Sequence, residues 1–349
     1  MNAITFHKQY KIGTEKVSDP VILDQRDAIV KVKFAALCGS DLHVYRGHEK
    51  GQDPGTVMGH EFVGEVVELG KEVKNIQKGD WVVSPFTTNC GRCYYCRIGL
   101  SCRCEEGQLF GWVSGGKGLQ GAQAEYVRVP LADSSLLSFS KDLPAEQVLF
   151  SGDILSTGYY CASRADLQLD ELAVVIGCGP VGLMSILSAR ELGAKKVIAI
   201  DAVPERLAIA EKFGAIAVNF KEEDAIEQVK EHSEGRGASS IMEAVGASSA
   251  GRLAFDIARP GATISTVGVH TSNHIDFSPV EAYDKNITYR IGRAPARAYM
   301  DKMIHLIASG KYPIGEIVSH RLALENSVHA YEIFDQKKEA CLKVVFDMK

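Results

Sequence analysis

The most constraining feature of the sequence is a regular alternation of apolar strands and amphipathic helices that begins at Leu172. We expect strands over residues 172–176, 196–200, 217–219, 240–244 and 262–267, and helices over 181–192, 205–213 and 225–232. Strands joined through helices pair in parallel, because each helix carries the chain back to the end of the sheet where the strand began. The alternation therefore predicts an α/β region with a doubly wound parallel sheet and helices on both faces.

A glycine-rich turn lies between the first expected strand and the first expected helix. Gly177, Gly179 and Gly182 have the spacing Gly-x-Gly-x-x-Gly, and Pro180 and Val181 complete the segment. In this setting the first glycine permits a tight turn, the second admits a pyrophosphate, and the third lets helix and strand pack closely. The unpaired N–H groups at the helix start then favour a phosphate. We interpret the segment as a dinucleotide site; the alternative is a plain strand–helix turn.

An acidic residue at the end of the second expected strand indicates which dinucleotide binds. Asp201 lies 24 residues after Gly177. A carboxylate at this place accepts hydrogen bonds from the ribose hydroxyls and repels a 2′-phosphate, which favours NAD over NADP. Arg206 argues in the other direction, because its guanidinium would compensate the charge of a 2′-phosphate if the side chain turned inward.

Four cysteines stand close together at Cys90, Cys93, Cys96 and Cys104. Four thiolates around one ion form the closed tetrahedral shell of a structural zinc site. The alternatives are two disulfides or an iron–sulfur cluster. The chain has nine cysteines, an odd number, and its first ten residues do not read as a signal peptide, so we expect reduced thiols. Cys102 fits the spacing less well, and we interpret it as a spare thiol.

A second set of metal-ligand residue types lies outside this run. Cys38 and His60 offer a thiolate and an imidazole, and a catalytic zinc needs about three protein ligands with one position left open. Asp153 is the best candidate by sequence for the third ligand, and Glu61 is either a ligand or a partner behind the metal. Each residue alone also has an ordinary interpretation, as a buried thiol, a loop residue or a helix cap.

The rest of the chain indicates a two-domain globular protein. Residues 1 to about 150 contain short alternating strands and frequent turns, which suggest a barrel or sandwich, and the tail from about 293 is expected to pack back on this part. The length of 349 residues exceeds what one core usually holds. A net charge of −5, with no basic stretch and no run of 18 apolar residues, argues against nucleic acid or membrane as a partner.

Six motifs follow one another in the order expected for a known family. By these motifs the chain resembles zinc-dependent alcohol dehydrogenases of the medium-chain dehydrogenase/reductase superfamily along essentially its whole length. The motifs are Cys-Gly-Ser-Asp-Leu-His (38–43), Gly-His-Glu-Phe-Val-Gly (59–64), Lys-Gly-Asp-Trp-Val (78–82), the four-cysteine segment (90–104), Ser-Thr-Gly-Tyr (156–159) and Gly-Cys-Gly-Pro-Val-Gly (177–182). The resemblance implies a chaperonin-10-like β-barrel catalytic domain over 1–155 and 293–349, with a zinc lobe over 86–108. It also implies an inserted Rossmann domain over 156–292 that binds NAD, with the active site in the cleft between the domains.

The resemblance also implies residue roles. Cys38, His60 and Asp153 would hold a catalytic zinc, with Glu61 behind it. Ser40 would take the substrate proton and His43 would continue the relay towards solvent. The further residues that would contact the cofactor are Thr157, Arg206, Val245, Val267, Gly268, Val269 and, at the pyrophosphate, Lys343.

The activity implied is reversible hydride transfer between a primary or secondary alcohol and NAD, giving an aldehyde or ketone, with two zinc ions per subunit. A polyol, sugar or threonine-type dehydrogenase of the same superfamily is the alternative, and a non-catalytic protein that binds NAD and zinc is a remote one. We expect a cytoplasmic homotetramer, with a dimer as the second choice, that acts on a small molecule.

Overall fold

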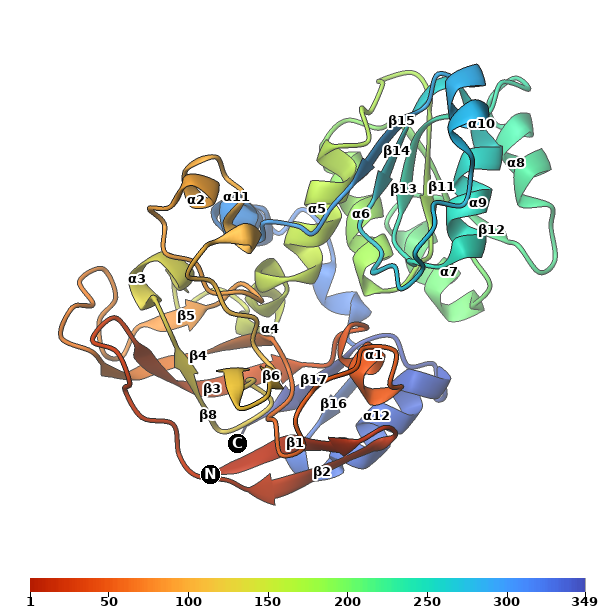
Figure 1. The fold of residues 1–349 in the computed structure, drawn as a ribbon. Coiled ribbons are helices and arrows are strands. Elements are labelled where there is room, and N and C mark those ends of the chain that lie inside the picture. The colour runs from red at the N-terminus through yellow and green to blue at the C-terminus, as the bar shows by residue number, and fades with distance from the viewer. Residues whose placement is uncertain (349) are drawn as a thin grey trace. The chain divides into compact units, whose positions relative to one another are not determined.

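The computed structural model describes residues 1–348, and the chain divides into two compact units. The larger unit combines Met1–Ser156 with the segment that begins at Pro295, and the smaller unit is Thr157–Ala294. The tail therefore packs with the N-terminal part, and the strand that ends it pairs with β3 of that part. Both termini lie in the larger unit (Figure 1).

The smaller unit is built on a six-stranded parallel sheet in the order β12-β11-β10-β13-β14-β15. Its strands are β10 (Leu172–Ile176), β11 (Lys196–Asp201), β12 (Ile216–Asn219), β13 (Ala238–Glu243), β14 (Ala258–Thr266) and β15 (Thr288–Ile291). The central strand β10 is buried along its whole length, as a strand covered on both faces must be. The predicted doubly wound parallel sheet is confirmed.

Helices cover both faces of this sheet (Figure 1). They are α5 (Ile154–Ser163), which begins in the larger unit, α6 (Pro180–Glu191), α7 (Pro204–Lys212), α8 (Ala225–Glu231), α9 (Ser248–Ile257) and α10 (Pro279–Asp284). The strand order reverses between β10 and β13. In open sheets of this type a ligand binds outside the carboxyl ends of the strands at such a reversal.

The larger unit contains a seven-stranded mixed sheet. Its strands are β3 (Ala28–Ala36), β4 (Glu61–Leu69), β5 (Trp81–Val83), β8 (Tyr126–Val129), β9 (Leu137–Ser138), β16 (His320–Leu322) and β17 (Val344–Asp347). The pair β3–β4 is antiparallel and forms the middle of the sheet. Since β17 pairs with the carboxyl end of β3, residues from both ends of the chain meet where β3 ends and β4 begins.

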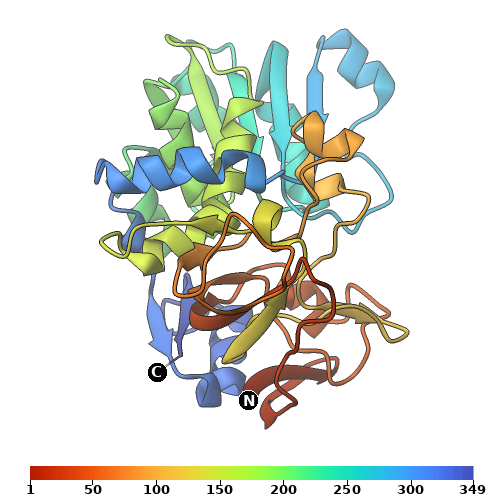
Figure 2. The ribbon, with the colours of Figure 1, turned by 90° about the vertical axis from the view of Figure 1, so that its left-hand side faces the viewer.

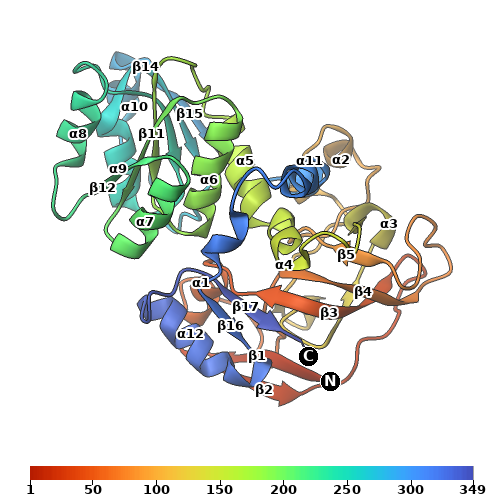
Figure 3. The same ribbon diagram turned by 180° about the vertical axis from the view of Figure 1, so that it is seen from behind.

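Shorter elements complete the larger unit. Two hairpins are formed by β1 (Asn2–Lys8) with β2 (Lys11–Lys16), and by β6 (Trp112–Ser114) with β7 (Lys117–Leu119). The helices are α1 (Asp41–Tyr45), α2 (Tyr94–Arg97), α3 (Ala132–Ser135), α4 (Ala145–Val148), α11 (Arg297–Ala308) and α12 (Ser327–Gln336), with 3-10 turns at η1 (Ser101–Arg103), η2 (Leu149–Gly152), η3 (Ile314–Ile317) and η4 (Leu324–Asn326). Helix α12 packs beside β2 (Figures 2 and 3). Within residues 1–348, no helix is long and apolar enough to cross a membrane.

Candidate metal centres and dinucleotide turn

Four buried side chains of the larger unit converge at one point. Cys38, His60, Glu61 and Asp153 each offer a ligand atom, and these atoms all lie within 4.8 Å of one another. The Oδ2 atom of Asp153 is 3.3 Å from Sγ of Cys38 and 3.2 Å from Nε2 of His60. Cys38 follows β3, His60 and Glu61 stand where β4 begins, and Asp153 follows η2. The structure thus brings together the three ligands expected for a catalytic metal, and Glu61 with them.

A carboxylate behind His60 fixes the direction in which the imidazole points. The Oδ1 atom of Asp41 is 3.3 Å from Nδ1 of His60, and its Oδ2 atom accepts a hydrogen bond from the main-chain N–H of Cys38 at 2.9 Å. Gln123 donates to the same Oδ2 atom, and the hydroxyl of Tyr331 donates to Gln123 at 2.9 Å. Because Nδ1 faces Asp41, Nε2 faces the other ligands. In zinc sites a carboxylate behind a ligating histidine orients the ring in the same way.

Asp41, Gln123 and Tyr331 were not predicted as site residues. The local signal for Asp41 is its place three residues after Cys38, where it can bond the main chain of that residue. Gln123 and Tyr331 come from distant parts of the chain, so only the fold reveals them.

Lys343 forms a buried ion pair behind the metal ligands. Its side chain and that of Glu61 are both 0% exposed, and Nζ donates to Oε1 of Glu61 at 2.7 Å and to the main-chain oxygen of Leu37 at 3.0 Å. The ammonium therefore compensates the charge of Glu61, and its contact with the cofactor pyrophosphate stays a prediction.

The electrostatics of the four-ligand group suit a divalent cation. Burial, followed by the charges of Asp153 and Glu61, raises the pKa of Cys38 to about 11. Burial alone would lower the pKa of His60, but the carboxylates of Asp41 and Asp153 outweigh it and raise that pKa well above its ordinary value. A metal ion that displaces both protons would turn these groups into a thiolate and a neutral imidazole. The Oε2 atom of Glu61 is buried and has no hydrogen-bond partner among the described residues, so one more oxygen is available to a cation.

Ser40 and His43 lie on the segment that follows Cys38. The hydroxyl of Ser40 is 3.2 Å from Nε2 of His60, and His43 is on the short helix α1 that begins directly after Ser40. Burial lowers the pKa of His43. Its Nδ1 atom is buried and without a hydrogen-bond partner in the part of the chain that the structure describes. The imidazole is therefore neutral near pH 7.

The four-cysteine segment forms a second ligand cluster. The sulfur atoms of Cys90, Cys93, Cys96 and Cys104 lie within 4.8 Å of one another, and none of these cysteines is in a disulfide. The main-chain N–H of Cys90 points to Sγ of Cys104 at 3.1 Å, and that of Cys93 to Sγ of Cys90 at 3.3 Å. Donors of this kind stabilise thiolates, so the arrangement fits a closed tetrahedral metal site. Cys102 is buried in η1 and does not belong to the cluster.

The glycine-rich turn of the smaller unit has the geometry that a dinucleotide needs. Gly177 has φ +88°, and a Cβ atom there would overlap the side chain of Val245. A Cβ atom on Gly182 would overlap the main-chain oxygen of Gly177, so only glycine allows this close contact. Gly179 caps α6, which has Pro180 as its first residue and Val181 as its second, and a Cβ atom on Gly179 would meet only the guanidinium of Arg206. The start of α6 thus leaves room for a phosphate.

Asp201 stands beside this turn at the end of β11. Its Oδ2 atom accepts the main-chain N–H of Cys178 at 2.7 Å, and its Oδ1 atom accepts those of Ala202 and Val203. Nη1 of Arg206 is 4.0 Å from Oδ2, so the guanidinium lies beside the carboxylate. These bonds hold the carboxylate next to the glycine-rich turn.

The remaining expected cofactor residues lie on α5 and on two loops of the smaller unit. Val245 follows β13, and Val267, Gly268 and Val269 follow β14, so both loops leave the carboxyl ends of neighbouring strands. Val245 and Val269 expose 47% and 43% of their surface. Thr157 is buried on α5, four residues after Asp153.

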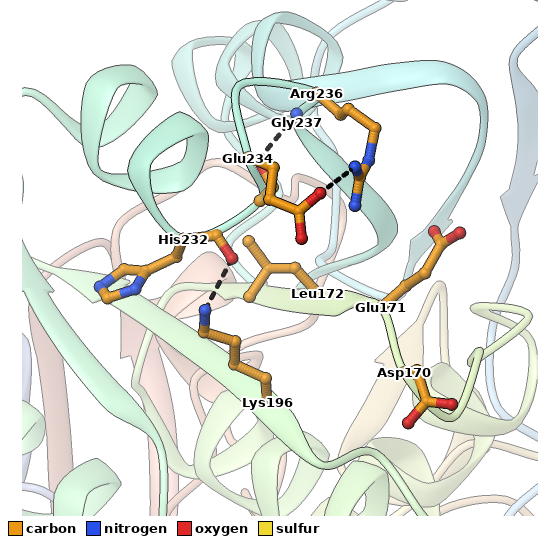
Figure 4. Close-up of a pocket in the computed structure, with 9 residues that line it drawn as sticks. Asp170, Glu171, Leu172, Lys196, His232, Glu234, Arg236 and Gly237 are labelled. Atoms are coloured by element: carbon orange, nitrogen blue, oxygen red, sulfur yellow. Dashed lines mark hydrogen bonds and ion pairs between the residues drawn. The ribbon is translucent and has the colours of Figure 1, made fainter.

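A separate pocket lies at the opposite, amino ends of β10, β11 and β13 (Figure 4). Its charged groups are satisfied locally: Lys196 donates to the main-chain oxygen of His232, Arg236 pairs with Glu234, and Glu171 pairs with Arg259 outside the pocket. We assign it no part in the metal or cofactor sites.

Comparisons with known proteins agree with this geometry. Residues 24–138 match the family described as alcohol dehydrogenase GroES-like domain, and residues 180–309 match the family described as zinc-binding dehydrogenase. The chain is 43% identical to zinc-type alcohol dehydrogenase B of Aspergillus flavus, over 99% of this chain and 81% of that protein. Among solved structures, an alcohol dehydrogenase from Thermus sp. ATN1 has a TM-score of 0.93 and 40% identity over 99% of both chains. Zinc-dependent alcohol dehydrogenase 2 from Streptococcus pneumonia has a TM-score of 0.91 and 32% identity over 99% and 98% of the two chains.

Proposed function

Because the chain belongs to the zinc-type alcohol dehydrogenases of the medium-chain dehydrogenase/reductase superfamily, we propose that it oxidises primary or secondary alcohols reversibly to aldehydes or ketones with NAD as the cofactor. The observation that carries the proposal is the convergence of Cys38, His60 and Asp153, with Glu61 beside them, in one buried site. These residues would hold one zinc ion, and Cys90, Cys93, Cys96 and Cys104 would hold a second. When bound, zinc supplies Lewis-acid polarisation of a substrate oxygen and NAD supplies the hydride acceptor.

The chain's own residues handle the proton. The hydroxyl of Ser40 lies 3.2 Å from the ligand atom of His60, close enough to meet a substrate hydroxyl at the same point. His43 has an unpaired Nδ1 atom, and its lowered pKa keeps the ring neutral near pH 7, so the ring is free to relay the proton that Ser40 passes on. Asp41 keeps the His60 ring in place during this transfer, because it holds the opposite nitrogen.

NAD is proposed over NADP because of Asp201. Both of its oxygens accept main-chain hydrogen bonds, which keep a negative charge at the ribose position and oppose a 2′-phosphate. The guanidinium of Arg206 lies beside this carboxylate, so the positive charge of Arg206 is partly compensated by Asp201.

A homotetramer, or failing that a dimer, is proposed as the assembly. The zinc lobe exposes Tyr94, Tyr95 and Ile98, and α10 exposes Val280 and Tyr283, so each unit presents apolar side chains that an interface would cover. Light scattering after size-exclusion chromatography would give the number of subunits.

A cytoplasmic location is proposed because both metal sites depend on reduced thiols.

The proposed function is tested by steady-state absorbance at 340 nm with primary alcohols, secondary alcohols, polyols and threonine, each with NAD and NADP. Cys38→Ser and His60→Ala should each abolish turnover while NADH binding, measured by fluorescence, is retained. Cys341→Ser is the matched control, since Cys341 is a buried thiol of the same unit outside both clusters. Turnover in the two ligand variants at the wild-type rate would refute a metal-centred reaction, and a signal with polyols or threonine alone would move the substrate class to the alternative.

A further inference from the structure

Glu243 is the last residue of β13, and it connects two loops of the smaller unit. Its Oε1 atom accepts the main-chain N–H groups of Val245 at 2.7 Å and Gly246 at 2.8 Å. Its main-chain oxygen accepts those of Val267 at 3.0 Å and Gly268 at 3.3 Å. One residue therefore binds both the loop that follows β13 and the loop that follows β14.

His270 approaches the other side-chain oxygen of Glu243. Its Nε2 atom is 3.3 Å from Oε2, and the side chains of His270 and Glu243 are 15% and 1% exposed. A carboxyl group removed from water in this way costs free energy unless its oxygens are hydrogen-bonded. Here both side-chain oxygens have partners, and those partners come from the two loops.

The two loops touch so closely that their relative position is fixed. A Cβ atom on Gly268 would overlap the main chain of Gly246, and a Cβ atom on Gly246 would meet the main chain of Val269. The loops leave neighbouring parallel strands at their carboxyl ends, where ligands of open α/β sheets bind. Val245 and Val269 remain about half exposed on them, so apolar surface is available there.

We propose that Glu243 and His270 are positioning residues for the nicotinamide half of the cofactor. The inference rests on the proposed function, because it takes the two valine-bearing loops as the wall against which the nicotinamide ring packs. Glu243 holds both loops through four main-chain hydrogen bonds, and His270 holds the side chain of Glu243 from the second loop. Neither residue has to touch the cofactor; they act through Val245 and Val269.

The position of the pair predicts a selective effect on binding. The adenosine half of the cofactor would lie at Asp201 and the glycine-rich turn, which depend on other hydrogen bonds. Loss of the Glu243 side chain should therefore weaken ligands that carry a nicotinamide and spare ligands that do not. Glutamine at position 243 keeps an amide oxygen that can accept both loop N–H groups, so it should preserve most of the affinity.

The test compares NADH with ADP-ribose, which lacks the nicotinamide, by fluorescence titration and calorimetry on the full-length protein. Glu243→Ala should weaken NADH binding about tenfold, as expected for the loss of two hydrogen bonds, and ADP-ribose binding by less than about twofold. Glu243→Gln should stay within about threefold of the wild type for both ligands, and His270→Asn should weaken NADH about threefold. At saturating NAD, kcat should change much less than the KM for NAD.

Glu171→Ala is the matched control, because Glu171 is an ion-paired glutamate at the opposite end of the same sheet (Figure 4). It should leave both affinities unchanged. If Glu243→Ala does not fold, His270→Asn, which alters a side chain on the second loop, supplies the comparison of NADH and ADP-ribose affinities. The inference is overturned if Glu243→Ala and His270→Asn bind NADH as the wild type does, or if their ADP-ribose affinity falls in parallel. Wild-type protein that fails to bind NADH would overturn the proposed function as well.

Discussion

The buried ion pair behind the metal ligands gives the sharpest prediction about stability. Lys343 and Glu61 are both fully buried and 2.7 Å apart. Removal of one partner leaves an uncompensated charge without water, which costs about 3–5 kcal/mol in comparable pairs. We therefore expect Lys343→Met, which replaces the charged chain by an unbranched apolar one that is one atom shorter, to lower the free energy of unfolding by about this amount at pH 8.

The loss should depend on pH, because Glu61 can escape the penalty by taking a proton. Burial raises the pKa of Glu61 to about 7 even with Lys343 beside it. Without Lys343 that pKa rises further, so the folded state holds a proton that the unfolded chain, with a pKa near 4.5, releases. Stability of the variant is then lost as the pH rises towards and through the folded-state pKa. The deficit should be smaller at pH 6 than at pH 8.

The assay is urea unfolding followed by circular dichroism at these two pH values, on the wild type, Lys343→Met and the double variant Lys343→Met with Glu61→Gln. The double variant removes both charges and should recover about half or more of the loss. A loss below about 1 kcal/mol at pH 8 for the single variant, or a double variant no better than the single one, would refute the assignment of Lys343 as the counter-charge of Glu61.

Three further predictions concern the cofactor, the lobe and the relay. Asp201→Ser should shift the ratio of kcat/KM from NAD towards NADP by about tenfold or more, and an unchanged ratio would contradict the ribose assignment. Cys93→Ser should lower the melting temperature and remove the lobe's zinc while NADH binding persists; full zinc content would argue against the cluster. Burial lowers the pKa of His43 below 6.5, so its contribution to stability is full above pH 6.5 and is lost as the pH falls below it. His43→Asn should therefore flatten the acid-side fall of the melting temperature, and a slope equal to that of the wild type would speak against a buried neutral imidazole.

The parallel sheet could be predicted because its strands are continuous apolar runs. Leu172–Ile176 is buried on both faces, so its sequence shows no alternation, and the helices between strands begin at residues such as Pro180 and Pro204 that favour a helix start. The short edge strand β15 and the hairpin β1–β2 were not predicted. The residues of β2 and β15 are mostly exposed or half-buried, and all three strands mix polar with apolar side chains, so little in the local pattern marks them.

The metal ligands could be proposed from residue type, but their supports could not. Cys38, His60 and Asp153 are reactive side chains in recognisable segments. Gln123 and Tyr331 contribute only through a chain of hydrogen bonds across the fold. The pairing of Lys343 could not be predicted for the same reason, since a lysine in a strand gives no sign that its partner is Glu61, which is 282 residues away in the sequence.

The central claim is a metal ion held by Cys38, His60 and Asp153, and anomalous X-ray scattering at the zinc edge tests it most directly. Crystals grown from active protein should give two zinc peaks per chain, one within ligand distance of these three residues and one among the four lobe cysteines. A single peak confined to the lobe, in crystals of protein with full dehydrogenase activity, would contradict the account.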